Sequence, residues 1–211
     1  MTNPMPIHLV VFDLGNVLVR LVTGWEDACR FAGVDPIGTG NFQRHHALVC
    51  AFELGQTPEH EYLRGAAECF PALAPGQFES IFDAWLRGPY PRLPEMLTAL
   101  KSRRIRTACL SNTNARHWRI ALDPAGPYSA HLALIDHLFA SHLIGAAKPD
   151  PAAYRHVEQV TGVAAPNILF FDDREENVTA AREAGWRAEK IDPAQDGVEQ
   201  AAAHLRAAGL L

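Results

Sequence analysis

The sequence predicts an α/β fold in which a parallel sheet is covered by helices and interrupted by an inserted helical segment. Apolar runs of strand length recur along the chain, and from about residue 92 onward helix-like stretches lie between them. Such alternation is typical of a parallel sheet. Residues 19–91 differ, because their apolar side chains are spaced helically and they contain no convincing strand. We therefore expect an α/β core with an all-helical insertion.

Five apolar runs are the predicted strands of the sheet. The first, with the sequence IHLVVF, is nearly continuous and stops abruptly at Asp13. A run that is apolar on both faces suits a strand buried inside a parallel sheet. The predicted strands cover residues 7–12, 107–110, 137–140, 167–171 and, more weakly, 187–191.

The helices between these runs carry the expected end signals. Pro94 and Pro151 stand where two of the helices begin, and Gly185 follows the end of a third. Proline in the first turn and glycine after the last are the usual punctuation of a helix. We predict helices at residues 94–103, 151–161 and 174–184, and a final surface helix in the alanine-rich tail 195–211.

The chain length agrees with a core that carries an insertion. Its 211 residues exceed one typical domain of about 150 residues and fall short of two. We predict a discontinuous core of residues 1–18 and 92–211 and a helical domain of residues 19–91. Four aromatic residues of that helical domain are interpreted as its own packing core rather than as a platform for substrate: Trp25, Phe42, Phe52 and Trp85.

Composition excludes several classes of function. The net charge of −5 argues against a general affinity for nucleic acid or anionic membranes. No apolar run approaches the roughly 18 residues of a membrane span, and the first residues do not resemble a secretory signal. The four cysteines form no CxxC pair, which favours free thiols in a reducing compartment. We expect a soluble cytoplasmic protein, and the sequence does not indicate its oligomeric state.

Polar side chains follow the predicted strands at the edge where a parallel sheet binds its ligands. The residues at this edge, or on the loop before the fourth strand, are Asp13, Ser111, Asn112, Lys148, Asp172 and Asp173. Carboxylates offer a nucleophile and oxygen ligands for a hard cation, while hydroxyl, amide and ammonium groups can hold phosphate oxygens. The set predicts a site for Mg²⁺-assisted phosphoryl transfer on a small phosphate ester.

Four motifs, in this order, resemble the haloacid dehalogenase (HAD) superfamily of hydrolases. They are FDLGNV at 12–17, LSN at 110–112, KP at 148–149, and FDD at 171–173 followed by Asn177. The inserted helical segment is similar to the type-1 cap of that family. The phrases DLGNV and LSNTN also resemble the sugar-phosphate branch that contains α-D-glucose-1-phosphate phosphatase. The resemblance implies a Rossmann-like core, Mg²⁺ as cofactor and phosphatase activity, with a sugar phosphate as the favoured substrate.

The resemblance also implies which residues react and which bind metal. Asp13 would attack phosphorus and form an aspartyl-phosphate, which water then hydrolyses. The metal would be held by Asp13, by the backbone carbonyl of Gly15 and by Asp173. Asp172 and Asn177 would contact these ligands rather than the metal itself. Asp172 is nevertheless the other candidate for direct coordination of the metal.

Three further residues are assigned to the phosphate group by the same resemblance. Ser111 and the amide of Asn112 would hold phosphoryl oxygens. Lys148 would neutralise charge and bridge Asp13 to the phosphate.

One position departs from the usual phosphatase pattern. Most phosphatases of the superfamily carry a second aspartate two residues after the nucleophile, where this chain has Gly15. General acid–base help is worth about 10²–10⁴-fold. The substrate could have a good leaving group, such as an anomeric sugar phosphate. A residue of the helical segment (Arg44, His45 or His46) or a water could supply the proton, or activity could be lost.

Two other functions stay open at this stage. A 2-haloacid dehalogenase would use Asp13 without metal, although adjacent carboxylates facing Asp13 would then repel one another. A non-catalytic module that binds phosphate is favoured by the missing aspartate and opposed by the retained reactive residues. His45 and His46 are interpreted as surface or packing residues, because adjacent side chains on a helix diverge and make a poor metal site.

Overall fold

The centre of the molecule is a parallel sheet of five strands in the order β5-β4-β1-β6-β7. The structure is a computed structural model that describes residues 5–36 and 40–211. The strands are β1 (Leu9–Phe12), β4 (Arg106–Ser111), β5 (His137–Ala140), β6 (Ile168–Asp172) and β7 (Arg187–Lys190). Each coincides with one of the predicted runs to within two residues at either end, so the predicted α/β fold is confirmed.

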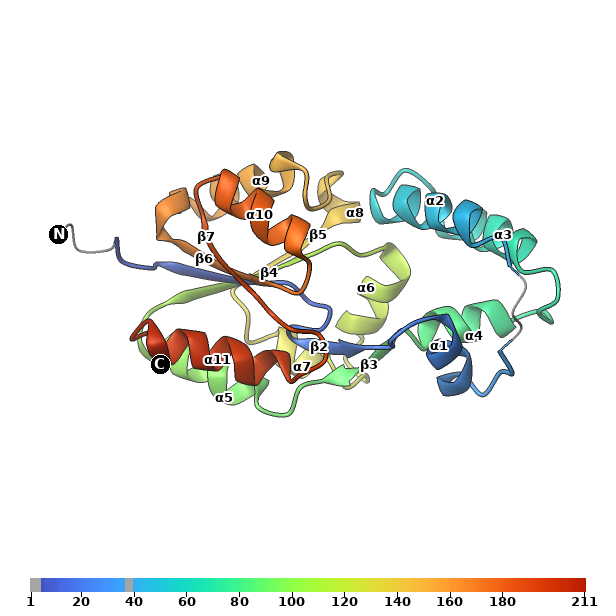
Figure 1. The fold of residues 1–211 in the computed structure, drawn as a ribbon, viewed down its shortest axis with the longest axis horizontal. Helices are drawn as coiled ribbons and strands as arrows, with labels where there is room; N and C mark the ends of the chain where they lie inside the picture. Colours follow the sequence, from blue (N-terminus) through green and yellow to red (C-terminus); the bar gives the residue numbers. More distant parts are fainter. Residues whose placement is uncertain (1–4, 37–39) are drawn as a thin grey trace.

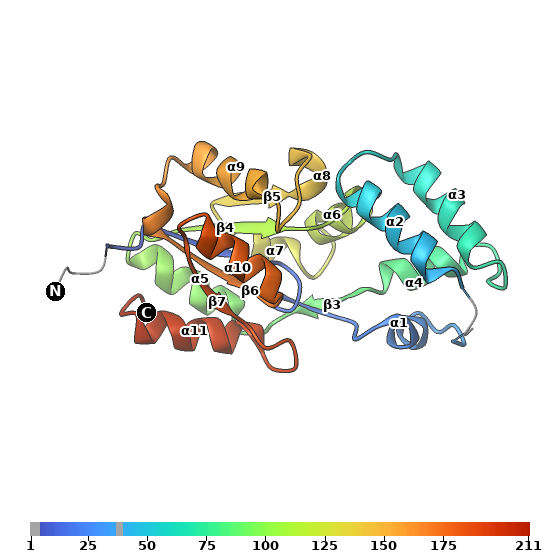
Figure 2. The same cartoon turned by 45° about the horizontal axis from the view of Figure 1, so that its top comes forward.

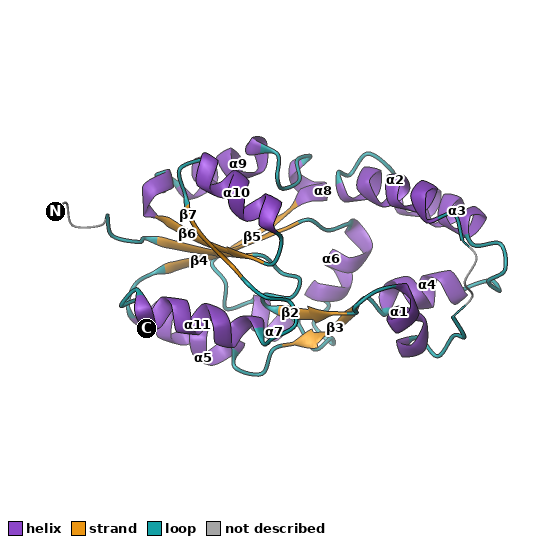
Figure 3. Ribbon diagram, in the orientation of Figure 1, coloured by secondary structure: helices purple, strands orange, loops and turns teal. Residues whose placement is uncertain are grey.

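Helices cover both faces of this sheet (Figures 1 and 3). On β1, Val10 and Phe12 pack toward one helical layer and Leu9 and Val11 toward the other, because successive strand side chains point to opposite faces. One layer contains α5 (Leu93–Ser102) and α11 (Gly197–Ala207), and the other contains α9 (Pro151–Thr161) and α10 (Glu175–Glu183). These are the helices that the sequence predicts.

Shorter helices lie between the strands of the core. They are α6 (Ala115–Leu122), α7 (Ser129–Leu132), α8 (Ser141–Ile144) and the 3₁₀ turn η1 (Ala165–Asn167). Because α6 and α8 begin soon after β4 and β5 end, they lie at the carboxyl edge of the sheet, where the candidate site is expected. None of the helices within residues 5–36 and 40–211 has the length and apolar character that a bilayer crossing needs.

The helical segment lies beyond this same edge of the sheet (Figure 2). Its helices are α1 (Trp25–Phe31), α2 (Phe42–Glu53), α3 (Glu59–Cys69) and α4 (Gln77–Asp83). They enclose a core of their own in which Phe52 stacks on Tyr62 at 4.5 Å between ring centroids. We call α1 to α4 the cap; the predicted domain boundaries at residues 18/19 and 91/92 stay a prediction.

Two short strands that the sequence does not reveal connect the cap to the core. β2 (Val19–Leu21) and β3 (Leu86–Pro89) pair with each other in antiparallel fashion, so the expectation that residues 19–91 contain no strand is wrong. The strands are three and four residues long, and β3 includes a glycine and a proline. Local propensity and periodicity therefore give no signal, because the pairing depends on contacts distant in sequence.

Candidate active site

The fold brings the predicted site residues to one place at the carboxyl edge of the sheet. Asp13 follows β1 directly, whereas Ser111 and Asp172 are the last residues of β4 and β6. Since β4 and β6 flank β1 in register, these three side chains meet without help from a flexible loop. Lys148 reaches them from the loop before α9.

A buried lysine links two of the carboxylates. The Lys148 Nζ donates to Asp13 Oδ1 at 2.6 Å and to Asp172 Oδ2 at 2.7 Å. Burial raises the pKa of Asp13 to about 7; Lys148 opposes this rise, while Asp172 and Asp173 add to it. Burial works to lower the pKa of Lys148, but the two carboxylates outweigh it and raise that pKa above its usual value. The lysine is therefore held as a cation.

The carboxylate of Asp172 is saturated by protein donors. Besides Lys148, it accepts hydrogen bonds from Asn177 Nδ2 at 2.9 and 3.1 Å and from the Arg174 backbone N–H at 2.9 Å. Asp172 is fully buried. Its oxygens thus have several partners. The neighbouring Asp173 is half-buried, and among the described residues a single side chain, that of Asn16, donates a hydrogen bond to it, at Oδ2.

Asn16 orients Asp173, a role that the sequence reasoning missed. Its Nδ2 donates to Asp173 Oδ2 at 2.9 Å, and its Oδ1 accepts from the Leu21 N–H at 3.2 Å. Asn16 has a φ of 56°, in the left-handed region that asparagine tolerates better than most residues. Burial raises the pKa of Asp173, and the Asn16 hydrogen bond opposes that rise. The available signal was its place in the DLGN motif.

The three aspartates could hold a cation together. One oxygen each from Asp13, Asp172 and Asp173 lies within 4.8 Å of the others. Three carboxylates face a single lysine in a buried setting, which leaves an excess of negative charge. An all-oxygen donor set of this kind suits a hard divalent cation such as Mg²⁺.

Gly15 lies beside these carboxylates, and the side chain of Leu21 lies close to the position that a Cβ atom on Gly15 would take. A Cβ atom at this position would lie 2.7 Å from Leu21 Cδ1 and 3.6 Å from Asp13 Oδ2. Leu21 belongs to β2 and also lines the cavity in front of Asp13. The leucine therefore occupies the space in which a second acid, if present, would stand.

Asn112 shapes the loop that carries the lysine. Its Nδ2 donates to the Lys148 carbonyl at 2.7 Å, and its Oδ1 accepts from the Lys148 N–H at 2.8 Å. The side chain is thus engaged by the protein itself, and a contact of Asn112 with phosphate would have to come from its backbone N–H. Ser111 is buried and lines the cavity beside Asp13.

A cavity of about 500 Å³ lies between these residues and the cap. His45 and His46 line it, whereas Arg44 is not among the described residues that do so and pairs with Glu68 instead. Burial lowers the pKa of His45 to about 4, and its Nε2 lies 3.0 Å from the Tyr62 hydroxyl. His45 is therefore neutral at pH 7 and packs within the cap, while it also lines the cavity. Its interpretation as a surface or packing residue stays a prediction.

Glu53 is an acid of the cavity that sequence reasoning missed. It lies at the end of α2, lines the cavity and is largely buried, which raises its pKa to about 7; the charge of Arg174 opposes the rise. Among the described residues, no side chain donates a hydrogen bond to its carboxylate. Its backbone carbonyl lies 2.6 Å from Ser141 Oγ at the start of α8, which fixes this end of α2 against the core.

The interpretation of the cap aromatics is correct for one residue and incomplete for three. Phe52 is buried in the cap, stacked on Tyr62. Trp25, Phe42 and Trp85 pack within the cap too, yet each also lines the cavity. Helical spacing could not reveal this, because the cavity forms only where the cap meets the core.

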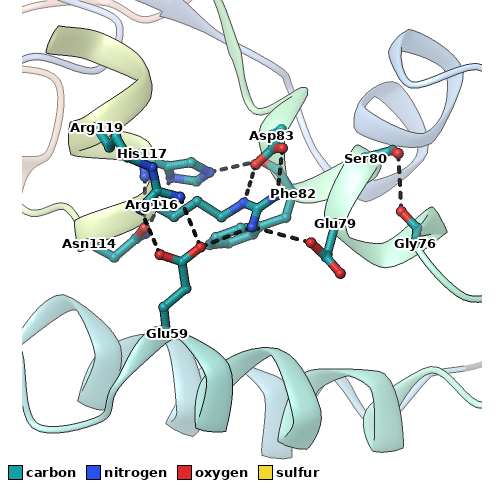
Figure 4. A network of polar contacts seen from close by, with 10 residues as sticks. All are labelled: Glu59, Gly76, Glu79, Ser80, Phe82, Asp83, Asn114, Arg116, His117 and Arg119. Atoms are coloured by element: carbon teal, nitrogen blue, oxygen red, sulfur yellow. Dashed lines mark hydrogen bonds and ion pairs between the residues drawn. The ribbon is translucent and has the colours of Figure 1, made fainter. Parts of the chain in front are cut away.

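An arginine of the core ties two cap helices to the site (Figure 4). Arg116 on α6 donates through Nη2 to Asp83 Oδ2 at 2.7 Å and through Nη1 to Glu59 Oε1 at 3.0 Å. The next residue, His117, lies with its Nε2 2.8 Å from the Phe82 carbonyl. Through these contacts α6 holds α3 and α4 over the carboxyl edge of the sheet.

Comparisons with known proteins agree with the motifs and the fold. The sequence profile of haloacid dehalogenase-like hydrolases matches residues 7–185. A protein of Mycobacterium tuberculosis named Phosphatase MT3486 is 43% identical over 208 residues, covering 92% of this chain and 93% of that protein. An (S)-2-haloacid dehalogenase of a Pseudomonas species is 31% identical over 108 residues, covering 51% of this chain and 45% of that enzyme.

Solved structures share the architecture. A HAD family enzyme of Bacteroides thetaiotaomicron, solved as a magnesium complex, superposes with a TM-score of 0.76. It is 23% identical, and the match covers 93% of this chain and 98% of that one. At this level of identity the likeness concerns the fold, and it extends over the core and the cap together.

Proposed function

This chain belongs to the haloacid dehalogenase-like hydrolases, and from that premise we propose that it is a Mg²⁺-dependent phosphatase acting on a small phosphate monoester. The observation that carries the proposal is the contact of Lys148 with both Asp13 and Asp172, next to Asp173. It combines a nucleophile, a fixed cation and an excess of carboxylates. The relative at 43% identity is named a phosphatase, which supports the same activity.

Asp13 is the proposed nucleophile. Its carboxylate attacks phosphorus, forming a bond from Asp13 to phosphorus while the bond from phosphorus to the alcohol oxygen breaks. Water then attacks the aspartyl-phosphate and releases inorganic phosphate. The position directly after β1 supports this role, because a rigid strand end aims the carboxylate.

Asp13, Asp173 and the Gly15 carbonyl are the proposed metal ligands. Asp173 is favoured over Asp172, because protein donors already occupy the Asp172 carboxylate. When bound, Mg²⁺ would offset the repulsion between Asp13 and the phosphate dianion. The Bacteroides enzyme was solved as a magnesium complex, which supports this choice of ion.

Lys148, Ser111 and Asn112 are the proposed partners of the phosphate oxygens. Lys148 is a buried cation held at Asp13, so it can stabilise the negative charge of the transferring group without rearranging. Ser111 offers its hydroxyl. Asn112 offers its backbone N–H, since its side chain holds the lysine loop.

Glu53 is the proposed source of the proton that Gly15 cannot supply. It lines the same cavity, and with a pKa of about 7 it carries a proton in much of the population at neutral pH. A carboxylic acid with a pKa near the working pH is suited to general acid catalysis. A sugar phosphate, favoured by the resemblance, needs this help least if its anomeric oxygen leaves.

Phosphate release from a panel of esters, with Mg²⁺ or with chelator, tests the proposal. We expect turnover with Mg²⁺ and its loss in chelator and in Asp13→Asn, while the exposed-site control Asp35→Asn keeps full activity. Full activity on 2-chloropropionate in chelator would identify a dehalogenase instead. Binding of beryllium fluoride and Mg²⁺ without turnover of any ester would identify a phosphate-binding module.

A further inference from the structure

The cavity in front of Asp13 has walls of two different kinds. Its floor is formed by the polar residues at the carboxyl edge of the sheet, whereas most of its upper wall is apolar. The apolar residues come from the β2–β3 ribbon, α1, α2, α4 and the turn before β3, and they are Leu21, Trp25, Phe42, Val49, Ile81, Phe82, Trp85 and Leu86. A substrate anchored by phosphate at the floor would project its remaining part against this wall.

Most polar side chains along the cavity are already engaged within the protein. Asn114 accepts from the His117 N–H at 3.0 Å, and the His117 Nε2 lies 2.8 Å from the Phe82 carbonyl. The Asn112 side chain makes two hydrogen bonds to the backbone of Lys148. These groups are thus poorly placed to recognise hydroxyl groups of a substrate.

The polar groups that remain are few and scattered. His45 lies 3.0 Å from the Tyr62 hydroxyl. On the cap side and at the rim this leaves Glu53, the exposed His46, the exposed Arg174 and the buried Trp25 Nε1, which has no partner among the described residues. Arg174 pairs with Glu176 at 2.6 Å. A sugar buries several hydroxyl groups, and each hydroxyl left without a hydrogen-bond partner weakens binding. The cavity wall is therefore poorly suited to bind a polyol and well suited to bind an apolar group.

Resting on the proposed function, we propose that the substrate is the phosphate monoester of an apolar, ring-bearing alcohol or phenol. Its phosphate group occupies the place between Asp13, Lys148 and Ser111, and its ring lies against Phe42, Val49 and the neighbouring apolar residues. Burial of the ring's apolar surface against this wall stabilises the complex. A volume of about 500 Å³ admits one or two fused rings.

Cyclohexyl phosphate and glucose 1-phosphate provide a matched pair for the test. Both carry phosphate on a six-membered ring, but cyclohexanol lacks the hydroxyl groups and is the poorer leaving group. We expect kcat/KM to be at least tenfold higher for cyclohexyl phosphate, and higher again for 1-naphthyl phosphate. A kcat/KM for glucose 1-phosphate that equals or exceeds that for cyclohexyl phosphate overturns the inference.

A pair of nearly isosteric variants locates the apolar contact. Val49→Thr places a hydroxyl in the cavity wall, whereas Val160→Thr makes the same change on the exposed side of α9. We expect Val49→Thr to raise the KM for 1-naphthyl phosphate three- to tenfold, whereas Val160→Thr should leave this KM unchanged. An unchanged KM for 1-naphthyl phosphate in Val49→Thr counts against contact with this wall.

Acetyl phosphate separates failure of this inference from failure of the proposed function. It carries the reactive phosphoryl group without a ring, so its Mg²⁺-dependent hydrolysis reports on the floor of the cavity alone. Turnover of acetyl phosphate together with a preference for glucose 1-phosphate would reject the apolar substrate and retain the phosphatase. Absence of turnover for acetyl phosphate and for every phosphate ester would reject both.

Discussion

The Nζ of Lys148 lies 2.6 Å from Asp13 Oδ1, although 135 residues separate the two in sequence. The lysine side chain is 1% exposed, so its charge depends on Asp13 and Asp172 for compensation. Burying a charge without a partner is costly, whereas a paired and hydrogen-bonded charge is tolerated. This contact therefore matters for folding as well as for the proposed chemistry.

Removing the lysine should destabilise the protein strongly. In Lys148→Met two buried carboxylates lose their cation, and we expect the free energy of unfolding to fall by about 3–5 kcal/mol in denaturant titrations. Adding Asp172→Asn to this variant should recover about 1 kcal/mol or more, since it removes one of the unpaired charges. The exposed Lys101→Met should change stability by less than about 0.5 kcal/mol. A loss as small as that of the control would show that the pair contributes little.

The position two residues after Asp13 should accept an acid once Leu21 makes room. A Cβ on Gly15 would stand 2.7 Å from Leu21 Cδ1, so Gly15→Asp alone should cost about 1–3 kcal/mol of stability through overpacking. Gly15→Asp should keep Mg²⁺-dependent turnover, because the backbone carbonyl is unchanged. Turnover by Gly15→Asp combined with Leu21→Ala should exceed that of Leu21→Ala alone. Complete loss of activity in that folded double variant would contradict this view of the position.

Glu53 should make stability depend on pH. Its carboxyl has a pKa of about 7 in the folded chain and an ordinary pKa of 4.5, so the folded chain binds the proton more tightly. The stability that this provides is complete below pH 4.5 and is lost as pH rises through 7, by about 3 kcal/mol at most. The titratable groups that interact with it are Arg174, which directly precedes α10, and Tyr62 on α3.

Unfolding titrations of Glu53→Gln between pH 5 and 8 check this directly. The wild type should lose stability relative to the variant as pH rises, whereas Glu26→Gln on the exposed side of α1 should run parallel to the wild type. Kinetics supply a second readout: Glu53→Gln should lower kcat for cyclohexyl phosphate by about 10²–10⁴-fold and barely affect 4-nitrophenyl phosphate, whose leaving group needs no proton. Equal losses on both esters would exclude Glu53 as proton donor.

The arginine between core and cap should influence substrate affinity. Arg116 is 14% exposed and contacts Asp83 and Glu59, so Arg116→Met should lower stability by about 1–2 kcal/mol and raise KM by loosening the cap. Arg119 pairs with the same Glu59 but is 62% exposed, and Arg119→Met should cost less than about 0.5 kcal/mol. Equal effects of the two substitutions would show that the buried network does not hold the cap.

The sequence predicts the core well because each part of the signal is local. An apolar run followed by Asp13 is enough to place this residue at a strand end, and parallel strands bring their carboxyl ends to one edge. The same reasoning places Ser111 and Asp172 beside it. Lys148 follows from its motif, since a loop lysine alone gives no indication that it is buried between two carboxylates.

The parts that escaped prediction depend on contacts between cap and core. Asn16 acquires its role only through Asp173, and Glu53 acquires its raised pKa only when α2 packs against the core. β2 and β3 each lack a propensity signal and exist by pairing with one another. The apolar cavity wall could not be predicted for a similar reason. The helical spacing of its residues indicates that they are buried, but it does not indicate which of them line a cavity for substrate.

Phosphorylation of Asp13 is the most direct test of the proposed reaction. The enzyme is mixed with Mg²⁺ and 1-naphthyl phosphate, quenched in acid within one turnover, reduced with borohydride to trap the acyl phosphate, digested and analysed by mass spectrometry. The account predicts that the peptide containing Asp13 carries the mark of a reduced aspartyl-phosphate, and that Asp13→Asn and chelator-treated enzyme do not. Steady turnover with an unmodified Asp13 peptide, or with the mark on another residue, would contradict it.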